Sequence, residues 1–560
     1  MEYPAPGRCP SGIFLWILGL IALLPACSTE SYRKAADEEA LAILNEKQES
    51  VFGEKRPFKV EVPEDTPRTR LLEAIEKARN DPETEPEPLK LKLNLAGTLE
   101  VAAMCGRDFQ NQKETLFLSA LSLSTTRWEF DWQPSLTGSI GMDGNRRDTK
   151  ASGSASFGLS KTLRTGASVL GSLLHTFSRT LTSGNRWEAS SLLNIGLTQP
   201  LLRGFGAHIV MESLTQAERN VVYSLRSFER FRRRHVVSLT ATYYGLLRQL
   251  DRIEIEKSNL NNLKVSLALQ QALYEAGKRP KFQVDQNRQS VLRSETTLLS
   301  LQQRLRSSLD GFKITLGLPV ETEILLDRDE FETLQKKGIE TLEMTGAEAL
   351  KLALEKRLDL KTASDQVEDA RRQVVIAADN LRMGLDLDLS ADVPTEKGGS
   401  VKPDWKNVSL GAGLSWDLPV DRTRQRNTYR SAIISYERAV RDHDLQLDSV
   451  KQEVRDGIRN LRQIEQDYEI QKQSVSLAMS QVDETREKMR AGRAIMRDLL
   501  EAQETLVNAQ SSLSSRLVDY LTAKLELLRD VDILKLDPEG LKYDDRLDTY
   551  RSEEDSIKRK

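Results

Sequence analysis

Two long stretches of the chain carry apolar residues at the spacing of an amphipathic helix. Residues 207–276 and 422–491 contain no proline, and their apolar side chains recur at steps of three and four, the pattern of a coiled-coil seam. At about 1.5 Å per residue, each stretch predicts a rod roughly 100 Å long. The seam residues are Val236, Leu239, Tyr243, Leu246, Leu250 and Ile253 in the first rod and Leu447, Val450, Val454, Ile458, Leu461, Ile464 and Tyr468 in the second.

A glycine ends each rod, and a second helix follows it. The first rod breaks at Gly277, Lys278, Arg279 and Pro280, and a returning helix extends its hairpin over residues 207–316. The second rod breaks at Gly492, and its hairpin covers residues 422–534. Shorter helical patterns precede the strand-like regions, at residues 93–124 and 345–378.

Two regions have the alternation of β-strands. Residues 127–204 are rich in Ser, Thr, Gly and aromatic residues, with turn signals at Asp143-Gly144 and at residues 183–185. Residues 385–420 have the same character. The order helix, strands, rod, turn and rod therefore occurs twice, which predicts an internally duplicated α+β fold.

The two halves align at three places. Gly277 corresponds to Gly492, and an element of the form Leu-x-x-Ala followed by Asp occurs at Leu99 and at Leu350. The offset is 251 residues at the Asp of this element and 219 at the proline of Pro200 and Pro419, so the first half carries about 32 extra residues. An added or extended hairpin around residues 155–177 would account for them.

The expected organisation has six parts. Residues 1–26 are a signal peptide and residues 27–91 a solvated strap, with one short helix near residues 68–79. The first repeat spans residues 92–318, a linker spans residues 319–344, and the second repeat spans residues 345–535. A charged tail, residues 536–560, is expected to be loose.

The strand regions have features of a membrane wall. Residues 134–200 contain only three acidic residues, and all five tryptophans after the signal segment fall in the strand-like regions: Trp128, Trp132, Trp187, Trp405 and Trp416. Aromatic residues favour strands in any protein, but they also form the interfacial girdles of membrane β-barrels. About four strands per chain cannot close a barrel, because eight is roughly the smallest, and lipid excludes open edges. Several copies must therefore share one barrel.

The N-terminus resembles an export signal with a lipid-attachment site. Arg8 precedes a 12-residue apolar run at residues 13–24, which is too short to span a bilayer. The run ends in Leu24, Pro25, Ala26 and Cys27, similar to a bacterial lipobox in which Cys27 would be acylated. Ser28 favours the outer over the inner membrane. The alternative is an ordinary signal peptide with an incidental cysteine.

Composition excludes several functions. The 560-residue chain has 81 Lys and Arg against 84 Asp and Glu, so no basic excess exists to bind nucleic acid. No P-loop or dinucleotide-binding glycine motif is present, and the four histidines are isolated, which disfavours a metal site, a cofactor or an enzyme. With Cys27 acylated, Cys105 is the remaining thiol and an intrachain disulfide is excluded. The histidines are His175, His208, His235 and His443.

Four motifs in order resemble the TolC-like outer-membrane efflux protein family. Residues 199–206 (QPLLRGFG) are close to that family's signature between a strand and the first long rod. The Leu-x-x-Ala and Asp element occurs twice, and both glycine turns are followed by an acid and a Gln, as at Asp285-Gln286. Residues 498–502 (DLLEA) are near the family's D-x-x-D-A form.

The resemblance implies a homotrimeric channel. Four strands per chain would give a shared 12-stranded barrel in the outer membrane, and the rods would form an α-helical coiled-coil barrel through the periplasm. Such a duct exports small molecules or proteins, in tripartite efflux or type I secretion, with a periplasmic adaptor and an inner-membrane pump. It catalyses no reaction and uses no cofactor.

The resemblance also implies roles for residues near the glycine turns. Gly277, Lys278 and Arg279 and the matching Gly492, Arg493 and Ala494 would dock the adaptor. Asp498 and Glu501 would line a constriction at the tip, as rings of carboxylates that attract cations; otherwise they are solvated helix-face residues. The family often has a Tyr and a basic residue where this chain has Met489 and Ala494, so the gate contacts would differ, with Arg493 or Arg497 as substitutes.

A lipid-anchored periplasmic coiled-coil scaffold or adaptor is the alternative function. A scaffold would need no strands. An adaptor would have a β-rich domain between its rods rather than aromatic strands of low charge.

Overall fold

The computed structural model describes residues 29–80, 90–144, 149–181, 187–395, 403–537 and 540–544. The expected signal peptide and Cys27 lie outside these residues. The chain divides into two compact units. The first contains residues up to Arg56, Leu116–Val222 and Arg382–Pro419, and the second contains Pro57–Thr115, Tyr223–Leu381 and Val420–Lys560.

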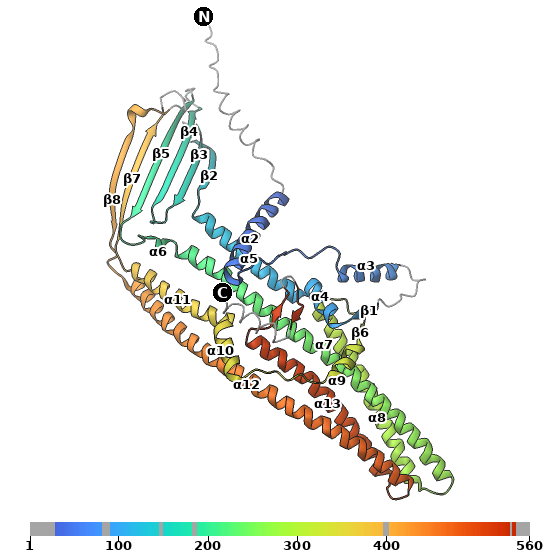
Figure 1. The fold of residues 1–560 in the computed structure, drawn as a ribbon. Coiled ribbons are helices and arrows are strands. Elements are labelled where there is room, and N and C mark those ends of the chain that lie inside the picture. Colours follow the sequence, from blue (N-terminus) through green and yellow to red (C-terminus); the bar gives the residue numbers. More distant parts are fainter. Residues whose placement is uncertain are drawn as a thin grey trace. The chain divides into compact units, whose positions relative to one another are not determined.

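The first unit is built on one six-stranded antiparallel sheet (Figure 1). The strand order is β2-β3-β4-β5-β7-β8, so every strand pairs with its neighbours along the chain. Connections this short between adjacent antiparallel strands form a meander. The strands are β2 (Gln133–Gly144), β3 (Thr149–Thr162), β4 (Ser168–Thr180), β5 (Glu188–Pro200), β7 (Gly384–Pro394) and β8 (Ser409–Asp417).

This strand number corrects the expectation of four strands per chain. The strand region of the first half forms four strands, and that of the second half forms two. The difference is the β3–β4 hairpin, which spans residues 149–180 and lies between β2 and β5 in the sheet. A twelve-stranded barrel made by three copies therefore does not follow from this chain.

The second unit is dominated by two long helical hairpins (Figure 1). Helix α7 (Glu212–Glu275) returns as α8 (Lys281–Leu316), and α12 (Thr423–Arg490) returns as α13 (Met496–Asp530). The predicted seams are the packed faces: Val236, Tyr243 and Leu246 are at most 2% exposed, and Val450 and Val454 are fully buried. Burial of these seams stabilises helices whose opposite faces are polar.

Shorter elements complete the two units. They are α3 (Pro67–Asn80), β1 (Lys90–Leu93), α4 (Leu95–Cys105), α5 (Arg107–Glu129), α6 (Ala207–Val210), β6 (Glu323–Leu326), α9 (Arg328–Lys337), α10 (Gly346–Lys356), α11 (Leu358–Asp379), β9 (Lys535–Leu536) and β10 (Tyr543–Asp544). One hydrophobic core of the second unit joins α4, β1 and α7 around Tyr243 and Phe312, and another joins α10, α12 and α13 around Ala353 and Leu525.

Three segments contain more structure than the sequence predicted. The strap contains a 24-residue helix, α2 (Thr29–Phe52), whose Ala40 and Leu44 are fully buried. The linker at residues 319–344 contains β6, which pairs in parallel with β1, and also α9. The tail is not loose at its start, because β9 pairs with β10 and Leu541 is 1% exposed in the core of the second unit.

Among the described residues, none of the helices has the length and apolar character that crossing a membrane requires.

Candidate functional site: the sheet and the helical turns

The six-stranded sheet has one apolar face. Strand register places Leu136, Phe157, Leu173, Leu193 and Val393 side by side in a row across five strands. The row is continued on β8, whose Leu410, Leu414 and Trp416 point to the same side. Many side chains on this face are exposed, including Ile140 of β2 at 81%, Leu410 at 79% and Trp416 at 73%, whereas Val393 is buried. An apolar face this extensive is unfavourable in water and indicates contact with lipid or with another protein.

The opposite face is lined by hydroxyl groups. Ser139, Ser154, Thr176 and Ser190 form a row over β2 to β5, and adjacent hydroxyls lie 2.8 Å apart in the Ser139–Ser154 and Thr176–Ser190 pairs. The alternation is imperfect on β4 and β5. Leu170, Leu174 and Leu192 lie on this polar face, and His175 and Ser191 share a hydrogen bond on the apolar face.

Strand β7 adds carboxylates to the polar face. Asp386, Asp388 and Asp392 alternate with apolar residues, so all three point to the same side. The side chain of Thr198 donates a hydrogen bond to Asp388, and that of Asn194 donates one to Asp392, at 2.8 and 2.7 Å. A polar face with fixed acidic groups opposite an apolar face is the arrangement of a barrel wall that separates water from lipid.

The tryptophans lie at the two ends of the sheet rather than along its strands. Trp132 precedes β2 and Trp416 is the penultimate residue of β8, at one end; Trp187 precedes β5 and Trp405 lies in the connection from β7 to β8, at the other. Trp128 departs from the prediction, because it lies in the last turn of helix α5. Each of the five indoles is at least 40% exposed.

Residues 199–206 join the strands at the end where the chain passes from β5 into α6. The Gln199 side chain and Thr165, in the β3–β4 turn, are linked by two hydrogen bonds of 3.0 and 3.3 Å. Arg203 donates a hydrogen bond of 2.9 Å to Asp417 at the end of β8. Gly166 has φ +92°, and a Cβ there would lie 2.5 Å from the carbonyl oxygen of Gly204, so the turn fits only with glycine. The motif thus ties three parts of the sheet together.

The two glycine turns have the same backbone geometry. Gly277 and Gly492 both have φ +71°. In each turn the residue after the glycine donates its backbone N–H to a carbonyl five residues earlier, Lys278 to Leu273 and Arg493 to Lys488, both at 2.8 Å. This is the Schellman arrangement, which requires a left-handed residue and therefore favours glycine. Gly277, Lys278, Gly492 and Arg493 are exposed, Arg279 is half-buried and Ala494 is buried.

Asp498 and Glu501 lie one turn apart at the start of α13. The Asp498 carboxylate accepts a hydrogen bond of 3.1 Å from the backbone N–H of Ile495, so it caps the helix as well as carrying charge. It is half-buried, whereas Glu501 is exposed.

Met489 and Ala494, which replace the family's Tyr and basic residue, pack together. Both belong to an apolar cluster with Val482, Met496 and Leu499. The second turn therefore has hydrophobic contacts at the two positions where the sequence analysis noted a departure from the family pattern.

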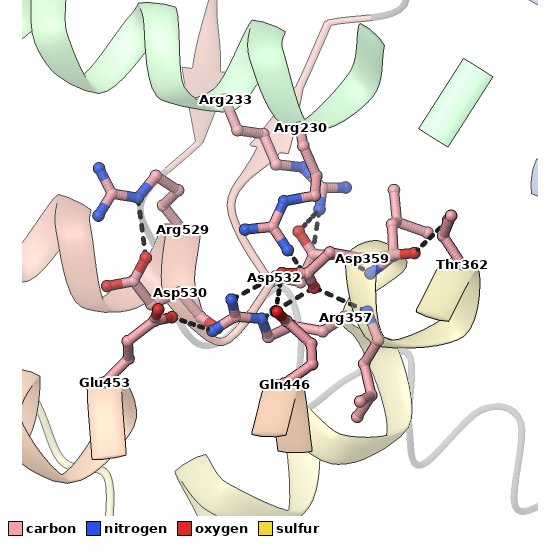
Figure 2. Close-up of polar contacts among 12 residues, drawn as sticks. Arg230, Arg233, Arg357, Asp359, Thr362, Gln446, Glu453, Arg529, Asp530 and Asp532 are labelled. Carbon is pink, nitrogen blue, oxygen red and sulfur yellow. Dashed lines mark hydrogen bonds and ion pairs between the residues drawn. The ribbon is translucent and has the colours of Figure 1, made fainter. Parts of the chain in front are cut away.

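A buried ion network connects four elements of the second unit (Figure 2). Arg357, which is 2% exposed, forms two hydrogen bonds with Asp359 at 2.8 and 3.0 Å and one with Glu453 on α12 at 2.6 Å. Arg230 of α7 pairs with the same Asp359, and Gln446 donates a hydrogen bond to it at 3.0 Å. A bidentate Arg–carboxylate pair fixes both distance and orientation.

The end of α13 joins this network through Asp532. Its backbone is left-handed, with φ 64°, and its carboxylate pairs with Arg233 and accepts a hydrogen bond of 3.1 Å from the backbone N–H of Leu358 (Figure 2). The sequence element Leu-x-x-Ala followed by Asp359 therefore marks the point where α7, α11, α12 and the end of α13 meet.

Charge pairing outweighs burial at Asp359. Burial raises the pKa of its carboxyl, but the hydrogen bond from Arg357 and the charges of Arg230 and Arg357 lower it further, so the net pKa lies below the usual 3.8. The ionised carboxylate therefore stabilises the fold above pH 3.8, and this contribution is lost as the pH falls through the lowered value.

Sequence reasoning identified Asp359 but missed its partners. Arg357 lies two residues before Asp359, and both are at the start of α11. This spacing is a local signal from which the Arg357–Asp359 pair could have been predicted. Arg230 and Asp532 come from distant parts of the chain, and nothing in the local pattern links them to Asp359. The four histidines lie on four elements, β4, α6, α7 and α12.

Comparison with known proteins gives one family and a set of solved folds. Residues 349–529 match the family model described as outer membrane efflux protein. No curated protein matches the chain in sequence.

Several solved channel structures share the fold. VceC of Vibrio cholerae, an outer membrane protein, is 16% identical with a TM-score of 0.58, covering 78% of this chain and 95% of that one. The Campylobacter jejuni CmeC outer membrane channel is 12% identical with a TM-score of 0.57, covering 82% and 88%. The open state of the Neisseria gonorrhoeae MtrE outer membrane channel is 13% identical with a TM-score of 0.57, covering 81% and 90%. Residues 349–529 of the chain therefore match the outer membrane efflux protein family, and the chain shares the fold of solved outer-membrane channels.

Proposed function

We propose that this chain forms an exit duct through the outer membrane and the periplasm. The observation that supports it most directly is the sheet, which has an extensive apolar face with many exposed side chains, a hydroxyl-lined and acidic opposite face, and tryptophans at both ends. Lipid contact accounts for the apolar face, a water-filled lumen for the polar face, and membrane interfaces for the tryptophans.

Several copies are needed to complete the wall. In the described sheet, β2 and β8 each pair on one side only. Unpaired backbone groups in lipid cost several kcal/mol each, so the edges must pair between copies. We take the assembly to be a homotrimer, as the family resemblance implies. The element order around the two helical hairpins, repeated in both halves, is consistent with internal duplication.

The helical hairpins supply the periplasmic part. Their glycine turns, with Gly277, Lys278 and Arg279 and with Gly492, Arg493 and Ala494, dock a periplasmic adaptor that couples the duct to an inner-membrane pump. Small molecules or proteins leave through the duct in tripartite efflux or type I secretion. Acylated Cys27 anchors the chain in outer-membrane lipid, and copies of Asp498 and Glu501 surround a narrow point.

The test is pore formation by the purified full chain. Added to planar lipid bilayers, it should produce stepwise conductance, and it should run as a heat-modifiable oligomer from the outer-membrane fraction. A monomer recovered from the soluble or inner-membrane fraction, with no conductance, would contradict the channel. That result would favour the lipid-anchored scaffold, although a scaffold gives no reason for the exposed apolar sheet face.

A further inference from the structure

The β3–β4 hairpin is a feature of the sheet to which the proposed function assigns no role. It adds residues 149–180 to the first half. In the second half, the described residues between β7 and β8 contain no such hairpin. Its position in the sheet, its two faces and its turn each bear on what it does.

The hairpin lies within the sheet and has the length of its neighbours. β3 has 14 residues and β4 has 13, compared with 12 in β2 and 13 in β5. All four are long enough to cross a membrane, for which about 9–11 residues suffice. The pairing is continuous across both new strands, from Leu136 to Phe157 to Leu173 to Leu193.

The hairpin also continues both faces of the wall. Phe157, Leu159, Val169, Leu173 and Phe177 extend the apolar face, and the other side carries serine and threonine hydroxyls. The polar-face residues are Ser152, Ser154, Ser156, Ser160, Ser172, Thr176 and Ser178. A hairpin that lay outside the wall would not require an apolar face and a polar face aligned with those of the neighbouring strands.

The turn of the hairpin is fixed to the rest of the sheet. Thr165 bonds to Gln199, and the backbone N–H of Gly206 donates to the carbonyl of Thr165 at 3.2 Å. Gly166 contacts Gly204 too closely for any side chain. The motif that leads into the first long helix is therefore built around this turn.

The two free edges can join copy to copy. With six antiparallel strands, β2 and β8 run in opposite directions, so β8 of one copy and β2 of the next form an antiparallel pair. The apolar residues of both edge strands then stay on one side, as a closed barrel requires. Each copy therefore adds six strands to the ring.

We infer that the β3–β4 hairpin is part of the barrel wall and that the duct has an eighteen-stranded barrel, wider than four strands per copy would allow. This rests on the proposed trimeric duct, since three copies of six strands give eighteen. For strands about 4.8 Å apart and tilted about 40°, the backbone diameter is about 36 Å for eighteen strands and about 24 Å for twelve. The hairpin would set the width of the exit through the membrane.

A deletion of residues 149–180 tests the inference with little disturbance to the remaining strands. Because the hairpin adds two antiparallel strands, its removal leaves β2 antiparallel to β5. Leu136 and Leu193 lie in one row across the sheet, so the shortened sheet can pair them directly. Electron cryomicroscopy of the full chain in lipid nanodiscs should show eighteen strands and a diameter of about 36 Å, and the deletion variant twelve strands and about 24 Å.

Three other outcomes would overturn it in different ways. A trimer of the full chain with twelve strands and the hairpin outside the wall refutes the inference and leaves the proposed duct intact. A twelve-stranded ring of two copies also refutes it. Absence of any membrane barrel refutes the duct as well.

A second measurement keeps the test decisive if the deletion variant does not fold. In a Cys105→Ser background, a fluorophore on Leu173→Cys should be quenched by brominated lipid, whereas one on Ser172→Cys, the preceding residue, should not. Leu414→Cys on β8 is the positive control, because it lies on the apolar face in either arrangement. Quenching at position 414 without quenching at position 173 would show that the hairpin is not part of the wall. No quenching at either position would show that the sheet is not in the membrane.

Discussion

At the scale of single residues, the ion network around the buried Arg357 links distant parts of the chain. Its guanidinium is 2% exposed and is bonded to two carboxylates on different helices. Removing charges from water is unfavourable, and this is offset only when every partner is present and well oriented. The network therefore contributes more to the position of its helices than an equal number of surface pairs would.

Replacement of Arg357 by Met should destabilise the chain strongly. The substitution leaves Asp359 with Arg230, Gln446 and the backbone N–H of Leu360, and it removes the partner of Glu453. Loss of a hydrogen bond to a charged group costs about 1.5–3 kcal/mol. Thermal unfolding in detergent, followed by circular dichroism, should show a clearly lowered midpoint. Arg459→Met is the matched control, because the Arg459–Asp456 pair is 72% and 54% exposed and contributes about 0–1 kcal/mol. Equal midpoints for the two variants would show that the network is not stabilising.

At the scale of elements, the two helical hairpins depend on their turns. Gly277 and Gly492 have the same φ and the same hydrogen bonds, and no neighbouring atom lies within 4 Å of the point that a Cβ would occupy. Backbone conformation alone therefore requires glycine there. The two turns lie in different halves of the chain and reverse the direction of a long helix with the same backbone geometry.

Gly277→Ala and Gly492→Ala should each destabilise their turn by about 1–2 kcal/mol, the strain of a left-handed residue with a Cβ. Hydrogen exchange at the backbone amides of Lys278 and Arg493 should become faster by about tenfold. Gly245→Ala is the control, because Gly245 lies inside helix α7 with open space around it, and alanine there should stabilise the helix by up to about 1 kcal/mol. Unchanged exchange in both turn variants would mean that the turns tolerate a side chain.

The elements also show what a sequence pattern can and cannot predict. The seams of α7 and α12 were readable because a repeat of three and four residues determines which side of a helix is buried. The local pattern alone gave too few strands, because the turn between β3 and β4 has only Gly166 as a signal. The offset of about 32 residues between the two halves did predict an added or extended hairpin around residues 155–177, and β3 and β4 confirm an added hairpin there. Helix α2 was missed because its sequence is mostly polar and only Ala40, Ile43, Leu44 and Gln48 are buried.

The sites follow the same division. Local motifs pointed to Gly277, Gly492 and Asp359, because each depends on its own turn or helix start. The pairing of β1 with β6 and the contact of Arg233 with Asp532 join residues more than two hundred positions apart. Such contacts depend on how the whole chain packs, and a single sequence does not contain that information in a local form.

At the scale of the whole molecule, the sheet is complete only as part of something larger. Its apolar face is exposed and its two edges are unpaired in the described residues, and both conditions are relieved together if copies join edge to edge in lipid. Assembly would also bring together charged residues that lie far apart in separate copies. Asp498 and Glu501 are two charges on one helix in one copy, and in the proposed trimer they would form two rings of three carboxylates.

If Asp498 and Glu501 form these rings, the duct should be cation-selective, and the selectivity should disappear when the charges are removed. In planar bilayers, Asp498→Asn combined with Glu501→Gln should reduce the cation-over-anion permeability ratio on the order of tenfold, because a narrow passage focuses the field of its lining charges. Asp483→Asn with Glu487→Gln on α12 removes the same number of negative charges, here from two exposed residues, and should leave the ratio unchanged. The effect should also depend on salt: it should be large at 0.01 M, where the Debye length is about 30 Å, and small at 1 M, where it is about 3 Å.

Asp498 also caps its helix, and Asp498→Asn retains a side-chain oxygen that can accept the capping hydrogen bond. This substitution therefore removes the charge and keeps the cap. If both double variants keep the ratio of the parent chain at low salt, the two carboxylates do not surround the pathway, and Asp498 is a helix cap alone.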